Sequence, residues 1–341
     1  MKRTAGDILA KIGLKKRALK VYFFFTNTWT DSVKSSRKTF LPLLANRRSR
    51  SGIYAIDLDS DWLGLGARIV KTLEILLYCD EHKLMPAIRY NYLEKDKAEH
   101  DYFGELFQYH RPVSGNLRYT AVWDVDELGW KENYNQKLKL GFARQLFDKY
   151  LGIRPDILEE TDRFVTANFN GRKVLGLHYR GTDKAGEAPL VAHEHLLQHI
   201  RTVMTQRPQL ELIFVSTDDE KIISFLQQSD LHLPVIFRQD AIRSKDGDQF
   251  HRKTEISKSV VHRDAIVNML LLSRTDFLLK TASILSDCSV IFNPALEVRV
   301  ISFPHSDNLT WWPATEIKRS QEKPTYATAE TRRPHQSRTE L

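Results

Sequence analysis

Residues 174–189, VLGLHYRGTDKAGEAP, place a short apolar run directly before a cluster of hydrogen-bonding and charged side chains. Arg180 is a permanent cation whose planar guanidinium can bind two oxygens of a phosphate group. Gly181 lets a ligand approach the backbone closely, and Thr182 and Lys184 add further donors. These residue types suit the binding of a diphosphate that gathers negative charge as its bond to a sugar breaks.

Two further polar segments follow apolar runs, at residues 216–219 (STDD) and 280–286 (KTASILS). In an open α/β sheet, ligands bind outside the carboxyl ends of the strands, where loops and helix N-termini converge. The sequence therefore predicts that three polar strand ends meet at one crevice. The alternative for Arg180 is a structural salt bridge with Asp183 or Asp218.

The elements that position these residues follow from the apolar periodicity, which alternates between strand and helix. The first half reads as a strand, a glycine turn, a helix and a strand, over residues 51–59, 61–68, 69–83 and 84–90. In the second half the pattern predicts strands at 171–180, 210–219, 233–238, 276–281, 289–295 and 299–304, and helices at 193–208, 220–230 and 260–275. This alternation is typical of a doubly wound parallel sheet in each half, joined near residues 155–172.

Composition narrows the classes of partner. The chain has 341 residues, a formal charge of +8 and 42% apolar residues, which indicates two globular domains and an acidic partner such as a phosphate ligand. A nucleic-acid partner is not expected, because no recognised binding motif accompanies the dispersed Lys and Arg. Cys79 and Cys288 read as small buried hydrophobes in a reducing compartment.

Neither a secretory signal nor a membrane-spanning run is recognised in the sequence, so the expected location is cytoplasmic. Residues 1–20 interleave aliphatic residues with Lys and Arg, which leaves two interpretations open. The segment can lie on an anionic membrane surface as a basic amphipathic helix, or it can be a solvated helix or frayed terminus. Residues 315–341 are polar and predict a tail.

Other motifs in the sequence could bind a metal ion or a sugar. Asp124 and Asp126 have the D-x-D form that metal-dependent sugar transferases use, and residues 57–61 contain a second copy. Histidines 193, 195 and 199 share one predicted helix, and Trp311 and Trp312 can stack on a sugar or cap a core. Both D-x-D and such histidine spacings often occur by chance, so the prediction is no metal, with a metal-dependent transferase as an alternative.

Three segments together resemble the α1,6-fucosyltransferase family, which includes the rhizobial nodulation fucosyltransferases. The stretch GLHYRGTDKAGEA is similar to the family motif H-x-R-R-T-D-K followed by Glu, FVSTDD is similar to its strand with paired Asp, and LLSRTDFLLKTASILS to its L-S-x-x-D-F-x-V-x-T-x-S-S segment. The likeness covers about residues 172–290. Departures are Gly181 for the second Arg, Ile284 for the second Ser, and Asn268 for a helix Asp that is matched one turn earlier by Asp264.

The resemblance implies a GT-B glycosyltransferase with two Rossmann-like domains facing a cleft, at residues 1–160 and 161–314, with GDP-fucose as donor, a carbohydrate acceptor and no metal. A catalytically silent nucleotide-sugar-binding protein is the alternative from another class. The roles implied by the resemblance are catalytic for Arg180, Asp183, Lys184 and Glu187, and nucleotide-sugar-binding for Gly64, Gly66, His178, Arg180, Asp218, Asp219, Asp264, Asn268, Thr281 and Ser283.

Overall fold

The structure is a computed structural model, and it describes residues 52–58, 63–91, 101–113, 117, 119, 134–181, 187–244, 256–305 and 311–322. The basic segment at 1–20, the D-x-D at 124–126, Asp183, Lys184 and the end of the predicted tail lie outside these residues. The chain divides into two compact units, residues 1–54 with 81–85, and residues 55–80 with 86–341. The described residues of the first unit are few, at 52–54 and 81–85.

The first described elements of the chain are β1 (Ile53–Leu58), α3 (Leu65–His82) and β2 (Met85–Tyr90). β1 and β2 pair in a two-stranded sheet, which gives the strand, helix and strand that the sequence predicts. Helix α3 begins inside the predicted glycine turn, and nearly all of its residues are buried. A helix that is buried on all sides has to pack against other elements over its whole circumference.

The second unit is organised around a five-stranded sheet in the order β7-β6-β5-β8-β9, whose neighbouring strands are all parallel. The central strand is buried at every position, as expected for a parallel sheet covered on both faces. The strands are β5 (Val174–Tyr179), β6 (Leu212–Thr217), β7 (Val235–Phe237), β8 (Phe277–Lys280) and β9 (Glu297–Val300).

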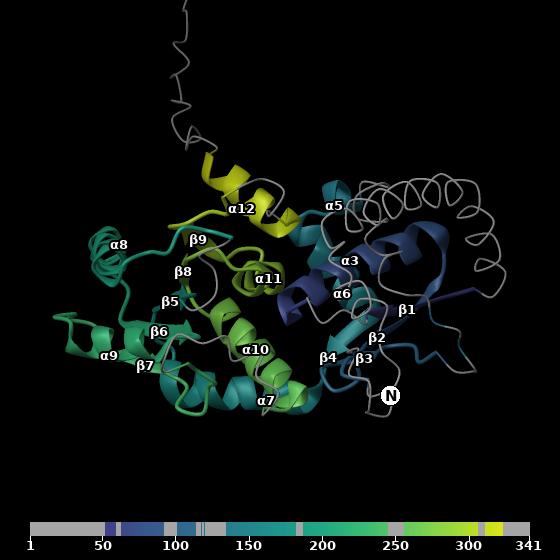
Figure 1. Cartoon of the computed structure of the whole chain (residues 1–341), viewed down its shortest axis with the longest axis horizontal. Coiled ribbons are helices and arrows are strands. Elements are labelled where there is room, and N and C mark those ends of the chain that lie inside the picture. Colours follow the sequence, from purple (N-terminus) through teal and green to yellow (C-terminus); the bar gives the residue numbers. More distant parts are fainter. Residues whose placement is uncertain are drawn as a thin grey trace, which may run out of the picture. The chain divides into compact units, whose positions relative to one another are not determined.

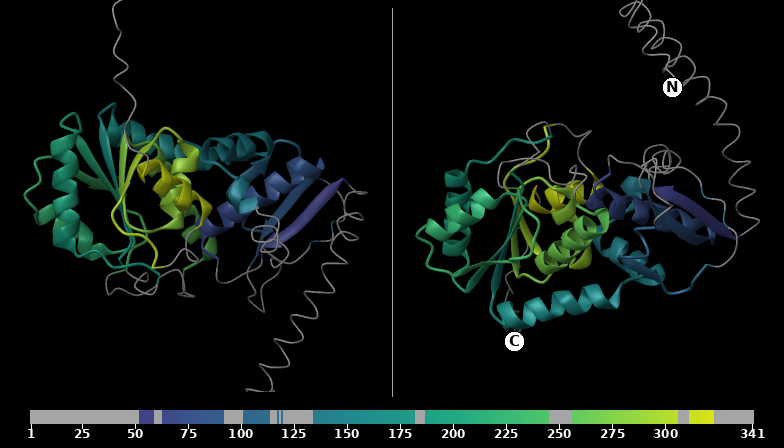
Figure 2. Two further views of the ribbon diagram at one scale, coloured as in Figure 1. Left: turned by 90° about the horizontal axis from the view of Figure 1, so that it is seen from above. Right: turned by 60° about the horizontal axis from the view of Figure 1, so that its bottom comes forward.

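Helices cover both faces of this sheet, with α8 (His193–Gln206) and α9 (Glu220–Gln228) on one face and α10 (Lys258–Ser273) and α11 (Ile284–Phe292) on the other (Figure 1). Figure 2 shows the same layering from a second direction. The core under α8 and α9 buries alternate residues of the strands, including Leu175, Leu177, Tyr179, Leu196, Ile200, Ile213, Val215, Ile222 and Leu279. The alternating residues of the strands, among them His178 on β5 and Lys280 on β8, therefore belong to the α10 and α11 face.

The remaining elements precede and follow this sheet. Strands β3 (Phe107–Tyr109) and β4 (Leu151–Ile153) pair antiparallel. The helices are α5 (Tyr134–Lys137), α6 (Leu140–Tyr150), α7 (Pro155–Phe164), the short π-helix η1 (Val165–Phe169) and α12 (Trp312–Glu322). The rings of Phe164 and Phe169 each contact Phe214 of β6, so the segment predicted as a junction near 155–172 is helical and packs against the sheet.

Two sequence predictions differ from the observed elements. The predicted strand at 289–295 is wrong, because its first four residues form the end of α11. A run of three apolar residues, 290–292, fits a buried helix as well as a strand, and here the helix that begins after Ser283 includes the run. Helix α12 continues to Glu322 and buries Ile317, so the chain is ordered eight residues past position 314.

Among the described residues, no helix combines the length and apolar character required to cross a bilayer.

Candidate active site

The polar ends of three strands lie side by side at the carboxyl edge of the five-stranded sheet, as the sequence predicts. The register pairs His178 with Ser216 of β6 on one side and with Lys280 of β8 on the other. Residues that directly follow β5, β6 and β8 are therefore neighbours, although they are far apart in the sequence.

Arg180 is held in this edge through both of its neighbouring strands. Its backbone N–H donates to the hydroxyl of Thr281 at 2.9 Å. Its guanidinium Nε lies 3.3 Å from one carboxylate oxygen of Asp218, whose other oxygen accepts from the Gly181 N–H at 3.1 Å. The salt bridge considered as an alternative thus exists, with Asp218. The Arg180 side chain is still 21% exposed against 7% for Asp218, so the guanidinium remains accessible to a ligand.

Gly181 is required for packing around this arginine. A Cβ atom at this position would lie 2.6 Å from the ring of Tyr179 and 3.0 Å from a carboxylate oxygen of Asp219. Any larger residue would force these side chains apart, which disturbs the turn that directs Arg180. The sequence suggested that Gly181 allows a ligand to approach the backbone. In the structure, the close contacts at Gly181 are with Tyr179 and Asp219 of the protein itself.

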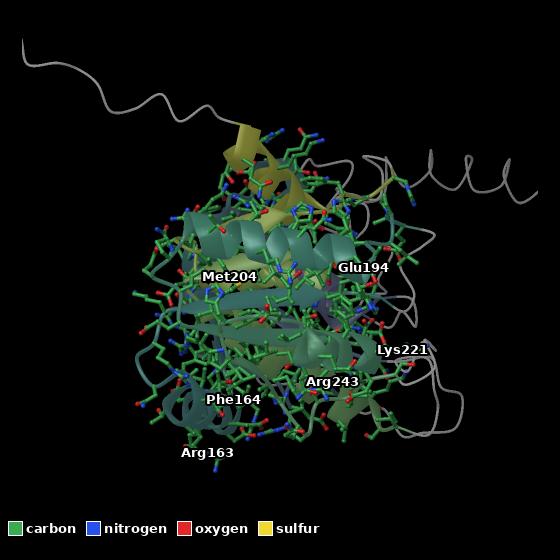
Figure 3. All side chains as sticks on the ribbon, turned by 90° about the vertical axis from the view of Figure 1, so that its left-hand side faces the viewer. Arg163, Phe164, Glu194, Met204, Lys221 and Arg243 are labelled. Carbon is green, nitrogen blue, oxygen red and sulfur yellow. The ribbon has the colours of Figure 1, made fainter. Side chains whose placement is uncertain are left out.

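Asp219 has a local structural role. Its carboxylate accepts from the Lys221 N–H at 2.9 Å and thereby caps the first turn of α9, which satisfies a backbone donor that has no partner within the helix. Its other oxygen is 3.9 Å from His193 at the start of α8. Figure 3 shows Glu194 and Lys221, in the first turns of α8 and α9, on the same side of the view, with Met204 towards the other end of α8.

His178 is buried below the site and is neutral. Burial lowers its pKa well below the ordinary value, and the positive charges of Lys280 and Arg180 lower it further. Its Nδ1 atom has no hydrogen-bond partner among the described residues. Because the imidazole is only 4% exposed, it contributes a neutral wall to the site and no charge.

Asp264 and Asn268, the residues matched to base recognition, lie on α10 and are hydrogen bonded to each other at 3.2 Å. Asp264 also accepts from the buried Arg238, which follows β7, at 2.9 Å. Arg238 binds Asp240 and Glu160 as well, at 2.8 and 3.2 Å. Burial raises the pKa of Asp264 to about 6, although Arg238 acts in the opposite direction.

We expect the stability of the protein to fall as pH rises through the range in which Asp264 ionises. Because its folded pKa of about 6 exceeds the ordinary Asp pKa of 3.8, the native state binds the proton more tightly and loses stability between about pH 4 and 6. The unfolding free energy of the wild type, measured by urea denaturation, should decrease by about 2 to 3 kcal/mol relative to Asp264→Asn from pH 4 to pH 7. A difference that is constant over this range would contradict the ionisation of a buried Asp264.

A small pocket lies at the carboxyl ends of β8 and β9 and the start of α11. Its volume is about 30 Å³, and its lining includes Glu187, Lys280, Ser283, Ser302 and Trp311. Glu187 and Ser283, both predicted site residues, are thus brought together. Glu187 is exposed, and its carbonyl accepts from the His305 N–H at 2.8 Å.

The sequence interpretation missed four polar residues at this edge, namely Arg238, Lys280, Asp287 and Ser302. Lys280 forms a buried ion pair with Asp287, with 2.7 Å between Nζ and Oδ1. The hydroxyl of Ser302 accepts from the Ala282 N–H at 3.1 Å. A charged residue at the end of an apolar strand was a usable signal for Lys280 and Arg238, because an unpaired charge there is costly.

The glycines of the predicted nucleotide loop occupy different surroundings. Gly64 is exposed just before α3. Gly66 is buried in the first turn of α3, where a Cβ atom would lie 2.7 Å from the backbone nitrogen of Leu285. Gly66 therefore allows the backbone of α3 to lie close to the first turn of α11.

In the part of the chain that the structure describes, no three His, Cys, Asp or Glu side chains are grouped so that they could bind a metal ion together. The rings of His195 and His199 contact each other at 4.8 Å between centroids, whereas His193 lies beside Asp219.

Comparisons with known proteins were made for sequence and for structure. No protein-family model matches the sequence, and no curated protein is significantly similar to it. Among solved structures, NodZ alpha-1,6-fucosyltransferase soaked with GDP-fucose matches with 14% identity and a TM-score of 0.47, over 70% of this chain and 92% of that chain. POFUT1 in complex with GDP matches with 12% identity and a TM-score of 0.43, over 73% and 98% of the two chains.

A mutant of Arabidopsis thaliana FUT1 in complex with GDP matches with 12% identity and a TM-score of 0.42, over 73% of this chain and 70% of that chain.

Proposed function

We propose that the protein is a glycosyltransferase of the GT-B type that transfers fucose, or a closely related sugar, from a GDP-linked donor to a carbohydrate hydroxyl. The observation that carries this proposal is Arg180, whose partly exposed side chain is paired with Asp218 and whose backbone N–H is bound by Thr281 at the carboxyl edge of a parallel sheet. This edge is where α/β proteins bind nucleotides, and a fixed guanidinium suits a diphosphate. In this proposal the domains are residues 1–160 and 161–314, and helix α12 extends the second domain past residue 314 to Glu322.

The proposed reaction is a single inverting displacement without a metal. The acceptor oxygen forms a bond to the anomeric carbon as the bond from that carbon to the diphosphate oxygen breaks, and GDP departs with the bonding electron pair. Arg180 and Lys184 stabilise the charge that grows on GDP, and Glu187 accepts the proton of the acceptor hydroxyl. The pocket that contains Glu187 and Ser283 supports this role for Glu187, and Asp183 is the alternative base.

In this proposal the remaining polar residues at this edge of the sheet bind the nucleotide of the donor. Thr281 and Ser283 follow β8 and lie beside the diphosphate position, and the Asp264 and Asn268 pair on α10 is the proposed contact for the base. Asp218 orients Arg180, and His178 closes the site from below. In this proposal the Asp264 carboxylate accepts hydrogen bonds from Arg238 and from the base of the nucleotide.

We expect Glu187→Gln to lower turnover by at least about 100-fold while leaving GDP affinity within about 2-fold of the wild type. The amide cannot accept the acceptor proton, but a general base contacts the acceptor and not the nucleotide. Steady-state transfer rates and calorimetric titration with GDP measure the two effects. The exposed Glu194 on α8 offers a matched control as Glu194→Gln. Full activity of Glu187→Gln would shift the role of base to Asp183.

The proposed function is tested by incubating the protein with labelled GDP-fucose, other GDP-sugars and UDP-sugars, together with mixtures of carbohydrate acceptors, followed by mass spectrometry of the products. Transfer from a GDP-sugar is the expected result. Saturable binding of GDP without turnover of any donor would leave the silent nucleotide-sugar-binding protein as the function. Transfer that requires an added divalent cation would favour the D-x-D alternative.

A further inference from the structure

The small pocket at the carboxyl ends of β8 and β9 has a buried cation, Lys280, in its lining. The side chain of Lys280 is 2% exposed and that of Asp287 is 4% exposed, and their ion pair links β8 to the first turn of α11. Asp287 is the one hydrogen-bond partner of the Lys280 ammonium among the described residues. Since an ammonium has three N–H donors, Lys280 can donate to oxygen atoms of a ligand in the pocket that it lines.

The pocket also has an aromatic wall, which is in contact with a cation outside the pocket. Trp311 lines the pocket, and the ammonium of Lys71 lies 5.4 Å from the centroid of its ring. Lys71 is itself buried and paired with Glu74 at 3.2 Å. A cation at this distance is attracted to the ring, so Lys71 favours this position of the Trp311 ring.

The charges of the pocket select the class of ligand. Its lining contains one cation, Lys280, and two carboxylates, Asp287 and Glu187, together with the hydroxyls of Ser283 and Ser302. A second phosphate group would be repelled by the excess negative charge. A neutral ligand with several hydroxyls can instead donate to the carboxylates and accept from the ammonium, while its C–H face packs on the indole ring.

We propose that this pocket is the subsite for the sugar ring of the donor, with Lys280 donating to a hydroxyl oxygen and Trp311 packing against the C–H face of the ring. This assignment rests on the proposed function and extends it. Thr281, which binds the Arg180 backbone, lies between Lys280 and Ser283 in the sequence. The sugar subsite is therefore adjacent to the proposed diphosphate position, as the covalent connection in a nucleotide sugar requires. At about 30 Å³ the pocket has room for a hydroxyl substituent of the ring, and in this proposal the ring itself lies at the mouth of the pocket.

The test compares the affinities for GDP and for GDP-fucose by calorimetric titration in three variants of the full chain. These are Trp311→Ala, Trp311→Phe and the double variant Lys280→Met/Asp287→Leu, in which both charges are removed so that neither is left buried alone. We expect the ratio of the dissociation constants, GDP-fucose over GDP, to rise about 10-fold in Trp311→Ala and in the double variant. The GDP constant should stay within about 2-fold, and Trp311→Phe should restore most of the affinity.

Lys173→Met is the matched control, because Lys173 forms a Lys–Asp pair with Asp276 at the opposite, amino end of the same sheet. Thermal denaturation checks that each variant is folded, and Trp311→Ala carries the test if the double variant is not. An unchanged ratio in Trp311→Ala, or equal losses for GDP and GDP-fucose, overturns the sugar subsite. A wild type that binds neither ligand overturns the proposed function as well, and this result is visible before any variant is compared.

Discussion

Arg180→Lys is expected to lose at least about 100-fold in turnover, equivalent to about 2.7 kcal/mol of transition-state stabilisation, with the fold unchanged. Charge is conserved in this variant, but an ammonium cannot bind two phosphate oxygens as the planar guanidinium does. The loss should be larger in turnover than in donor affinity, because negative charge on the diphosphate grows as the bond to the sugar breaks. Steady-state kinetics with GDP-fucose and titration with GDP measure the two quantities.

A matched control is Arg201→Lys, since Arg201 is an exposed arginine on α8, and this variant should retain wild-type turnover. The interpretation of Arg180 as a ligand-binding residue fails if Arg180→Lys keeps both its activity and its melting temperature. In that case the Asp218 contact at 3.3 Å would represent a salt bridge at a strand end and nothing more.

Asp287→Ala is expected to lower the unfolding free energy by about 3 to 5 kcal/mol, because it leaves the buried ammonium of Lys280 without its partner. The two side chains are 2% and 4% exposed, so solvent cannot compensate for the lost carboxylate. Urea denaturation followed by circular dichroism measures the effect.

The control for this prediction is the double variant Lys280→Met/Asp287→Leu, in which well-packed apolar side chains replace the pair. We expect it to recover most of the stability lost in Asp287→Ala, since replacing a whole buried pair is far less costly than breaking it. If Asp287→Ala unfolds at the same urea concentration as the wild type, the pair is not a buried ion pair in solution.

Most elements of the five-stranded sheet could be predicted from the sequence because period and length agreed in them, whereas the strand predicted at 299–304 overlaps β9 at only two residues. The helix predicted at 193–208 is α8, and the strand predicted at 276–281 contains β8. The prediction failed at 289–292, where three apolar residues after Ser289 carry no periodicity of their own and tertiary packing decides between helix and strand. Sequence likewise could not show that Ile317 is buried within α12, because a single apolar residue in a polar segment is a weak signal.

The candidate site was predictable in part for a related reason. Arg180, Asp218 and Thr281 follow apolar runs directly, and parallel strands place their carboxyl ends at one edge. The partners that hold Lys280 and Arg238 could not be found, because they lie on helices whose rotation about the sheet is fixed only by packing. The same limitation applies to Gly66, whose neighbour in the structure is the backbone of Leu285, more than two hundred positions later in the sequence.

The bond between the Arg180 N–H and the Thr281 hydroxyl joins residues that are 101 positions apart, and this separation has a consequence during synthesis. At the usual rate of about 5 to 20 residues per second, β5 leaves the ribosome roughly 5 to 20 s before β8. During that interval β5 has an unpaired apolar edge of the kind that associates with other chains or with chaperones. The nascent protein therefore acquires the proposed diphosphate site late, and chaperone dependence is expected to be concentrated in the period between the emergence of these two strands.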